Sequence, residues 1–506
     1  MFTVKDIDLA GRIGLLKTKS GPIETPTFLP VIDPARQELP LSDIESAGFN
    51  QVITNAYLIL KRFGGKAVDL GIHGVLGFKG IVMTDSGAYQ ILEYGDIEYS
   101  QETIIEYQKN IGSDIAVILD VPTGDVAYEE AKLTVEETLR RAREALELIK
   151  DTKPLWVLPI QGGKYLDLVS LSAREAAKLP GYSIYGIGSP TVFFERYELT
   201  TVLDMIHTAK RILPPGKPVH LFGAGHPLVF PFAIALGVDT FDSASYILYA
   251  RDGRYIVDHG VYRLEDLEYL PCSCPVCSRR SPGDLLEAGH AERTRLLALH
   301  NLYVIRRSLD NVKQAIREGR LWELLEEVSR RHPKALEALR KFRKYYKYVE
   351  AQTPRVKGRI YGVRLYDVES LWNPKILRFR LKTLTILDSL LETVESITLT
   401  PLAGNEKECL SDLIDVGRSM KIYYEPFIGI IPRELCGTYP TTQHLTPKTL
   451  SQPVVEDLAN TLRVLYSKAR ARGVPVTLVY CDRIWWHSIL AGEASSLGVN
   501  VRVECG

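Results

Sequence analysis

The chain has 506 residues, more than one ordinary domain needs, although an α/β barrel alone can occupy about 250. Lysine plus arginine and aspartate plus glutamate both total 62, so the formal net charge is zero, and 45% of the residues are hydrophobic. This balance excludes a globally basic nucleic-acid coat protein and a strongly acidic disordered chain, but it allows a local basic face. The longest apolar stretch, residues 228–238, is too short to span a membrane, and no export signal is evident, so we expect a cytoplasmic enzyme.

The first half of the sequence repeats one theme, in which a short β-rich run is followed by a helical stretch. Residues 128–150, for example, carry apolar side chains at helical spacing. Eight such runs predict an α/β fold, a (β/α)₈ TIM barrel over residues 1–270. A doubly wound open sheet is the rival, but the glycine-rich fingerprint that such a sheet usually carries is absent. The runs are residues 25–33, 49–57, 80–90, 114–125, 155–163, 183–190, 218–227 and 238–245.

Polar side chains and glycines gather where these predicted strands end. Asp85, Asp120 and Asp242 close three of the runs, and Gln161 closes another. Each aspartate could simply cap a following helix or turn. Because a barrel carries its active site at the carboxyl ends of its strands, we instead expect all four side chains to meet in one site.

The chain has seven cysteines, and three of them lie within six positions, at Cys272, Cys274 and Cys277. This pattern predicts reduced thiols and a metal rather than a disulfide framework. Three thiolates and one imidazole can close a tetrahedral structural zinc site, and His290 and His300 compete for the fourth position. His300 lies on a predicted helix and would project toward its packed side. We assign residues 271–345 to a zinc-binding helical subdomain that completes the barrel.

A local basic segment follows the cysteines. Residues 291–350 contain 15 lysines and arginines against 8 acids, a net charge of 15 − 8 = +7. Aromatic residues such as Phe342 and Tyr345 alternate with the basic ones, a pattern that can hold phosphates and stack bases. The alternative is a solvated helix face with the aromatic rings docked inward.

Residues 346–506 have a different pattern of strand-like and helix-like segments from the first half, and this pattern predicts a smaller α+β domain. Strands are expected within residues 359–368, 375–384, 421–432, 474–482 and 500–504, and a helix at residues 454–472.

Several motifs together resemble one family, the tRNA-guanine transglycosylases. They are M-T-D-S-G-A-Y-Q (83–90), Q-G-G (161–163), F-D-S-A-S (241–245) and the C-x-C-x₂-C-x₂₂-H spacing that ends at His300. The last two are more similar to the archaeal, archaeosine-pathway branch. The resemblance covers about residues 1–345 and, more weakly, residues 426–440. It implies an enzyme that exchanges the D-arm guanine at position 15 of tRNA for 7-cyano-7-deazaguanine (preQ0) through a covalent enzyme–RNA intermediate.

The resemblance also implies roles for the strand-end residues. Asp242 would be the nucleophile and Asp85 the general acid and base, although the sequence alone would allow the two to be interchanged. Asp120 would accept two N–H groups of the base, and Gln161 would donate to its carbonyl. Further base-binding positions implied by the motifs are Ser86, Tyr89, Gly186 and Ile187.

Two departures qualify the resemblance. No acid follows the sixth run until Glu195, which favours the neutral preQ0 over the cationic aminomethyl base preQ1. No RNA-binding PUA domain is evident, so we expect either that tRNA binding rests on the zinc helices or that a separate PUA-domain protein assists. The resemblance also implies tRNA and guanine as partners and a homodimer joined through the zinc region. The remaining alternatives are a queuosine-type enzyme that uses preQ1, a TIM-barrel glycoside hydrolase and a non-catalytic RNA-binding scaffold.

Overall fold

The computed structural model describes residues 2–88, 99–359, 361–402 and 419–505. The chain divides into two compact units, Met1–Tyr348 and Val349–Gly506, which are described separately. Over the described ranges, every helix is too short or too polar to cross a membrane.

The first unit is built on a barrel of parallel strands. Over its described residues, eight strands pair in the order β4-β11-β10-β9-β8-β7-β6-β5. A parallel bridge between Val31 and Ile53 joins the two ends, so the ring is nearly closed. Each of the eight predicted runs contains one of these strands, and the predicted (β/α)₈ fold is confirmed. The strands are β4 (Thr27–Pro30), β5 (Gln51–Asn55), β6 (Ile81–Asp85), β7 (Ile115–Val117), β8 (Leu155–Ile160), β9 (Ile184–Ile187), β10 (Val219–Leu221) and β11 (Thr240–Ser243).

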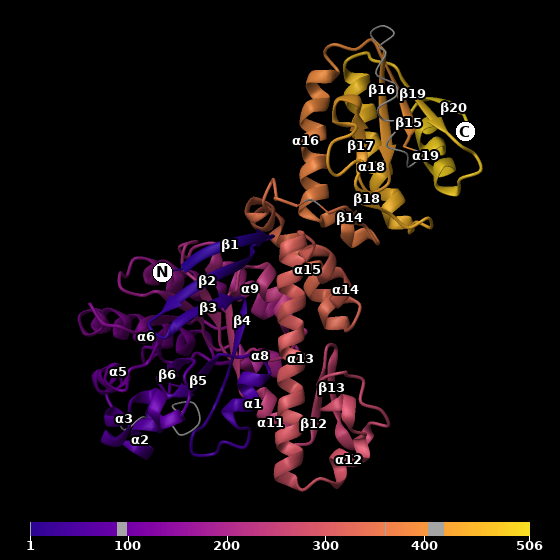
Figure 1. Ribbon diagram of the computed structural model, residues 1–506. Helices are drawn as coiled ribbons and strands as arrows, with labels where there is room; N and C mark the ends of the chain where they lie inside the picture. The colour runs from indigo at the N-terminus through magenta and orange to yellow at the C-terminus, as the bar shows by residue number, and fades with distance from the viewer. Residues whose placement is uncertain (1, 89–98, 360, 403–418, 506) are drawn as a thin grey trace. The chain divides into compact units, whose positions relative to one another are not determined.

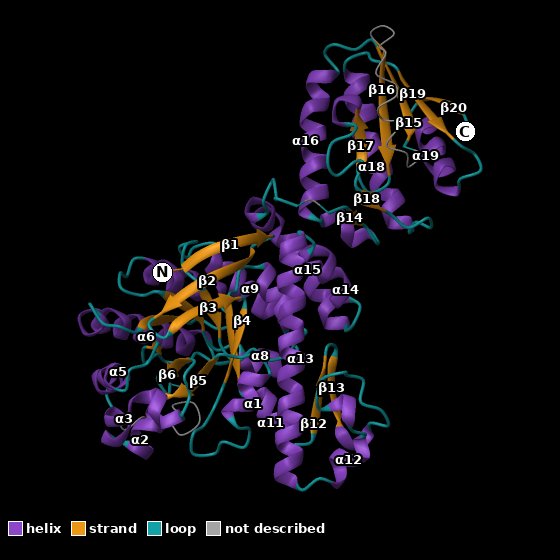
Figure 2. Cartoon of the chain, viewed as in Figure 1, coloured by secondary structure: helices purple, strands orange, loops and turns teal. Residues whose placement is uncertain are grey.

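Helices alternate with the strands around the barrel (Figure 2). The predicted helix at residues 128–150 is α6, whose buried stripe includes Ala131, Val135, Leu139 and Ala142 at helical spacing. The barrel helices are α1 (Leu41–Ser46), α2 (Ala56–Phe63), α3 (Gly65–Leu76), α5 (Gln101–Asn110), α6 (Tyr128–Ile149), α7 (Leu166–Ala177), α8 (Thr191–Glu195), α9 (Leu199–Lys210), α10 (Phe230–Ala235) and α11 (Ser245–Arg251).

A three-stranded antiparallel sheet, which the sequence analysis did not predict, precedes the barrel. It consists of β1 (Phe2–Asp8), β2 (Gly11–Thr18) and β3 (Gly21–Thr25). Leu16 and Ile23 from this sheet share one buried core with Ile81 and Ile115, the first residues of two barrel strands. The small sheet therefore covers the amino ends of the strands and leaves the carboxyl ends open for a site.

The remaining part of the first unit holds the cysteines. The 29-residue helix α13 runs beside α11 and β12 (Figure 1). Its buried face includes Leu297, His300, Val304 and Ile305, which follow the helical repeat. The elements are β12 (Arg254–Val257), β13 (Gly260–Arg263), η1 (Leu264–Asp266), η2 (Cys277–Arg279), α12 (Pro282–Glu287), α13 (His290–Glu318), α14 (Leu321–Ser329) and α15 (Pro333–Gln352).

The second unit is an α+β structure around a five-stranded sheet of order β17-β16-β15-β19-β20. The strand expected at residues 375–384 is wrong, because these residues lie in helix α16, where Ile376, Phe379, Thr383 and Leu387 form a buried helical stripe. The other expected elements are present. The elements are β14 (Val363–Arg364), η3 (Val368–Trp372), α16 (Pro374–Leu390), β15 (Ser396–Pro401), β16 (Ser419–Glu425), β17 (Gly429–Pro432), η4 (Arg433–Leu435), β18 (His444–Leu445), α18 (Gln452–Ala471), β19 (Val476–Tyr480), α19 (Trp485–Ser496) and β20 (Asn500–Val503).

A disulfide between Cys481 and Cys505 corrects the expectation that the cysteines would be reduced thiols. The bond joins the ends of β19 and β20, next to a backbone hydrogen bond from Glu504 N to Tyr480 O (2.8 Å). The two cysteines are 24 positions apart and meet only because the two strands are neighbours in the sheet. The three clustered cysteines, in contrast, are free.

Candidate active site and metal centre

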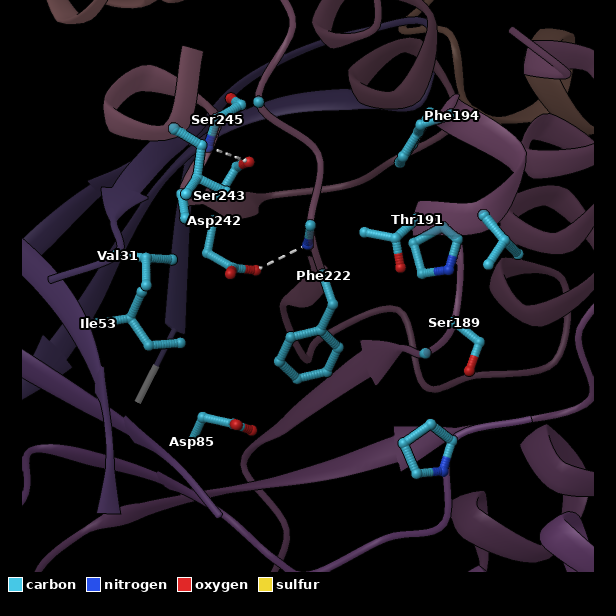
Figure 3. Close-up of a pocket in the computed structure, with 18 of the residues that line it drawn as sticks. Val31, Ile53, Asp85, Ser189, Thr191, Phe194, Phe222, Asp242, Ser243 and Ser245 are labelled. Atoms are coloured by element: carbon cyan, nitrogen blue, oxygen red, sulfur yellow. Dashed lines mark hydrogen bonds between the residues drawn. The ribbon is translucent and has the colours of Figure 1, made fainter. Parts of the chain in front are cut away.

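A cavity of about 830 Å³ lies at the carboxyl ends of the barrel strands. Asp85, Asp120, Gln161 and Asp242 all line it, although they come from four different strand ends. In Figure 3 the ring of Phe222 lies between the two aspartates on one side and Ser189 and Thr191 on the other. The structure therefore brings together the four strand-end side chains that the sequence singled out.

The carboxylate of Asp242 is held by two donors on the same oxygen. His220 Nε2 lies 2.9 Å from Asp242 Oδ1, and the backbone N–H of Gly223 donates to that oxygen at 3.1 Å. His220 is fully buried, and its Nδ1 lies 2.9 Å from Thr240 Oγ1. The sequence analysis missed His220 and Thr240, because only the pairing of β10 with β11 brings His220 beside Thr240 and Asp242.

The second aspartate, Asp85, differs from Asp242 in its hydrogen-bond partner and has a raised pKa. Burial, helped by a smaller contribution from the negative charge of Asp242, raises the pKa of Asp85 from 3.8 to about 6, although the N–H of Gly87 opposes the rise by donating to its carboxylate at 3.2 Å. A carboxyl group that titrates near 6 can both give and take a proton near neutral pH.

A third carboxylate, Asp120, pairs with Gln161. Gln161 Nε2 donates to Asp120 Oδ2 at 2.6 Å, and burial together with the charge of Asp85 raises the pKa of Asp120 to about 7. Gln161 Oε1 accepts hydrogen bonds from the N–H and hydroxyl of Thr123 (both 3.1 Å) and from Ser189 Oγ (3.0 Å). These bonds fix the orientation of the amide, so its NH₂ group faces Asp120.

The other predicted base-binding residues lie differently. Ser86, Gly186 and Ile187 are buried and are not among the described residues that line the cavity, whereas Gly188 and Ser189 do line it. A Cβ at Gly186 would come within 2.4 Å of the Phe222 ring, and a Cβ at Gly188 within 2.3 Å of Gln161 Nε2. The absence of a side chain at these two glycines therefore leaves room for the Phe222 ring and the Gln161 amide, which both line the cavity. Tyr89 lies outside the described residues.

The cysteine cluster has the composition and spacing of a metal centre. One ligand atom each from Cys272, Cys274, Cys277 and His300 lies within 4.8 Å of the others. His300 Nδ1 is 3.5 Å from Cys274 Sγ and 3.3 Å from Cys277 Sγ. A tetrahedral zinc ion, about 2.3 Å from sulfur and about 2.0 Å from nitrogen, would separate such atoms by about 3.5 Å, so the four residues fit zinc. His290 is exposed and lies outside the cluster.

Neighbouring groups fix the orientation of these ligands. His300 Nε2 donates to the carbonyl of Ile256 at 2.9 Å, so Nδ1 is left to bind a metal. The Tyr255 ring stacks on His300 with ring centroids 3.7 Å apart, and its hydroxyl lies 3.2 Å from Cys277 Sγ. Arg307 contacts Cys272 Sγ at 3.8 Å and pairs with Asp258 at 3.0 Å.

The aromatic residues of the basic segment point inward. Phe342 and Tyr345 are buried, and the Tyr345 hydroxyl donates to Asp204 at 2.7 Å. Lys341 also pairs with Asp204, at 2.6 Å, whereas Lys344 is exposed. This segment therefore offers exposed positive charge, but these two rings are not available to stack bases.

Comparison with known proteins identifies the family. A sequence profile for queuine tRNA-ribosyltransferase (TGT) matches residues 8–334. The chain belongs to this family. It is 53% identical over 491 residues to the tRNA-guanine(15) transglycosylase of Aeropyrum pernix, an alignment that covers 96% of each chain. It is 45% identical over 502 residues to the protein of that name from Sulfolobus acidocaldarius, with 99% of each chain covered. For the protein of that name from Saccharolobus solfataricus the identity is 44%, over 96% of this chain and 98% of that one.

Proposed function

We propose that the protein is a tRNA-guanine transglycosylase of the archaeosine pathway, which replaces guanine 15 in the D-arm of tRNA with preQ0. The observation that carries the proposal is the pair of aspartates, Asp85 and Asp242, which line one cavity of a family member. Its relatives over nearly the full length are named tRNA-guanine(15) transglycosylases.

The first half of the reaction breaks the bond between the ribose and guanine. Asp242 attacks the anomeric carbon with its second oxygen, Oδ2, because Oδ1 already accepts two hydrogen bonds. The departing guanine takes the proton of Asp85, and the ribose remains attached to the protein as an ester of Asp242. The target base must leave its stack to reach this cavity, so base flipping is part of the reaction.

The second half reverses these steps with a new base. The ester removes the negative charge of Asp242, one of the causes that raise the pKa of Asp85, so the Asp85 carboxylate is then easier to keep ionised. It takes the proton from the incoming base, whose ring nitrogen displaces Asp242 from the sugar. Two displacements give net retention at the anomeric carbon.

Base recognition follows from Asp120 and Gln161. An ionised Asp120 accepts the two adjacent N–H groups that guanine and preQ0 share, and the fixed amide of Gln161 donates to their carbonyl. Because the pKa of Asp120 is about 7, we expect base binding to weaken as the pH falls below that value.

The incoming base is proposed to be preQ0, since the wall formed by Gly188, Ser189 and Thr191 is uncharged. Glu195 also lines the cavity and could pair with the ammonium group of preQ1, which makes preQ1 the serious competitor. We further propose one structural zinc ion per chain, held by Cys272, Cys274, Cys277 and His300. Four protein ligands leave it no open position for catalysis.

The assembly that binds tRNA is also a proposal. Two copies of the chain would join through the zinc-binding subdomain, and a separate PUA-domain protein would add RNA contacts. Light scattering of the purified protein, alone and with tRNA, tests this; a monomeric mass in both samples contradicts the homodimer.

The decisive experiment is base exchange. The purified protein should replace labelled guanine in archaeal tRNA, with preQ0 and preQ1 offered in parallel as competitors. We expect preQ0 to be incorporated, and preferential use of preQ1 would replace the archaeosine assignment with a queuosine-type one. Absence of any exchange would overturn the proposed function.

The roles of the two aspartates need a separate measurement. Asp242→Asn should abolish the covalent RNA adduct that denaturing electrophoresis detects, because an amide does not attack the sugar. An adduct that persists in this variant would move the nucleophile to Asp85.

A further inference from the structure

We infer that His220, held by Thr240, is a positioning residue that sets the orientation of the Asp242 carboxylate; this inference rests on the proposed function. The motifs that relate this chain to its family do not include His220, and it does not line the described cavity wall. Its contribution would therefore pass through Asp242 rather than through the substrate.

The three side chains come together because two neighbouring strands are in register. His220 of β10 pairs with Thr240 of β11, and Asp242 lies two positions further along β11, so all three side chains project to the same face of the barrel sheet. His220 has no exposed surface, and its ring also packs against Phe222 with centroids 4.5 Å apart. The imidazole is thus held on all sides by protein.

The hydrogen bond to Asp242 requires a hydrogen on Nε2 of the ring. A carboxylate can only accept, so His220 Nε2 carries a hydrogen and donates it to Asp242 Oδ1 at 2.9 Å. On the other side of the ring, Nδ1 lies 2.9 Å from Thr240 Oγ1, a hydroxyl that can either donate to the ring nitrogen or accept from it. Thr240 therefore fixes the ring with its donor toward Asp242.

This arrangement has a consequence for the attacking oxygen. With His220 and the N–H of Gly223 both bound to Oδ1, the plane of the carboxylate is fixed. No hydrogen bond from the described residues is found at Oδ2, which is the oxygen left for the sugar. After attack, Oδ1 becomes the carbonyl oxygen of the ester and can keep both donors, so the orientation persists through the covalent intermediate.

Three substitutions at position 220 separate positioning from packing. His220→Leu replaces the imidazole with an apolar side chain of similar size, which removes the hydrogen-bond donor to Asp242. His220→Gln places an N–H near the position of Nε2, whereas His220→Asn places it near Nδ1. The rate of adduct formation in a single turnover, the KM for guanine and the melting temperature are measured for each full-length protein.

We expect His220→Leu and His220→Asn to slow adduct formation about 100-fold, as for loss of a preorganised donor, with the KM for guanine within about twofold of wild type. His220→Gln should recover most of the rate. Thr240→Val, which leaves position 220 intact, should lower the same rate by a smaller factor and serves if His220→Leu does not fold.

The outcomes distinguish this inference from the proposed function. If the wild type forms an adduct and exchanges guanine but His220→Leu and Thr240→Val do so equally fast, positioning by His220 is wrong and the function stands. Equal losses in the Leu, Asn and Gln variants, in parallel with their melting temperatures, would assign His220 to packing alone. A wild type without adduct or exchange removes the function and this inference together.

Discussion

Above neutral pH, the buried carboxylate of Asp120 should make the protein less stable than a neutral side chain at the same position would. Its pKa of about 7, against an ordinary 3.8, means that the folded state resists ionising this group. At about 1.4 kcal/mol per factor of ten, the difference corresponds to about 4 kcal/mol. The folded-state pKa is raised, so the penalty is small near pH 4, where Asp120 is protonated in the folded state and still partly protonated in the unfolded state. The free energy of unfolding then falls by about 4 kcal/mol as the pH rises through about 7.

Asp120→Asn should therefore be more stable than the wild type by about 4 kcal/mol at pH 8 and by almost nothing at pH 4. The amide cannot accept both N–H groups of the base, so guanine exchange should fall about 100-fold in the same variant. Urea denaturation at a series of pH values measures the first effect, and the exchange assay measures the second.

A matched control is Asp125→Asn at the rim of the cavity. Asp125 accepts hydrogen bonds from Lys164 (2.7 Å) and Arg196 (2.6 Å), which lower its pKa, so its neutral variant should gain nothing at pH 8. The reasoning is refuted if Asp120→Asn is no more stable than the wild type at pH 8, or if its advantage is the same at pH 4 and pH 8.

Four other substitutions test the remaining features. His300→Ala should lower the bound zinc well below one ion per chain in elemental analysis, whereas His290→Ala should leave the metal content unchanged; equal metal loss in both would contradict the ligand assignment. Gly188→Ala should raise the KM for guanine, because its Cβ would come within 2.3 Å of Gln161 Nε2, and an unchanged KM would show that the amide does not bind the base. Cys481→Ser should destabilise the second unit by about 3 kcal/mol in non-reducing denaturation, and a wild type equally stable with and without reductant would argue against the disulfide.

The barrel could be predicted from the sequence because each strand is a short β-rich run that ends in a polar or small residue. The same feature located Asp85, Asp120, Gln161 and Asp242, since parallel strands bring their carboxyl ends together. Residues 375–384 were predicted as a strand because basic and apolar residues nearly alternate there, but the buried residues follow a helical repeat.

Contacts between distant segments could not be predicted in this way. The Cys481–Cys505 disulfide depends on β19 and β20 being neighbours in the sheet. The bond from His220 to Asp242 depends on the register of β10 against β11, and a histidine within a β-rich run gives no sign of its partner.

The position of β11 in the barrel has a consequence for when the protein can react. This strand pairs with β10 on one side and with β4 on the other, so Asp242 lies where the last strand of the ring meets the first. Asp85 lies on β6, two strands beyond β4 in chain order, and the ring that joins β4 to β11 brings it into one cavity with Asp242. A chain that is still being synthesised, or that is only partly folded, therefore has no assembled pair of aspartates. Under the proposed mechanism, reactivity toward RNA therefore requires the closed ring.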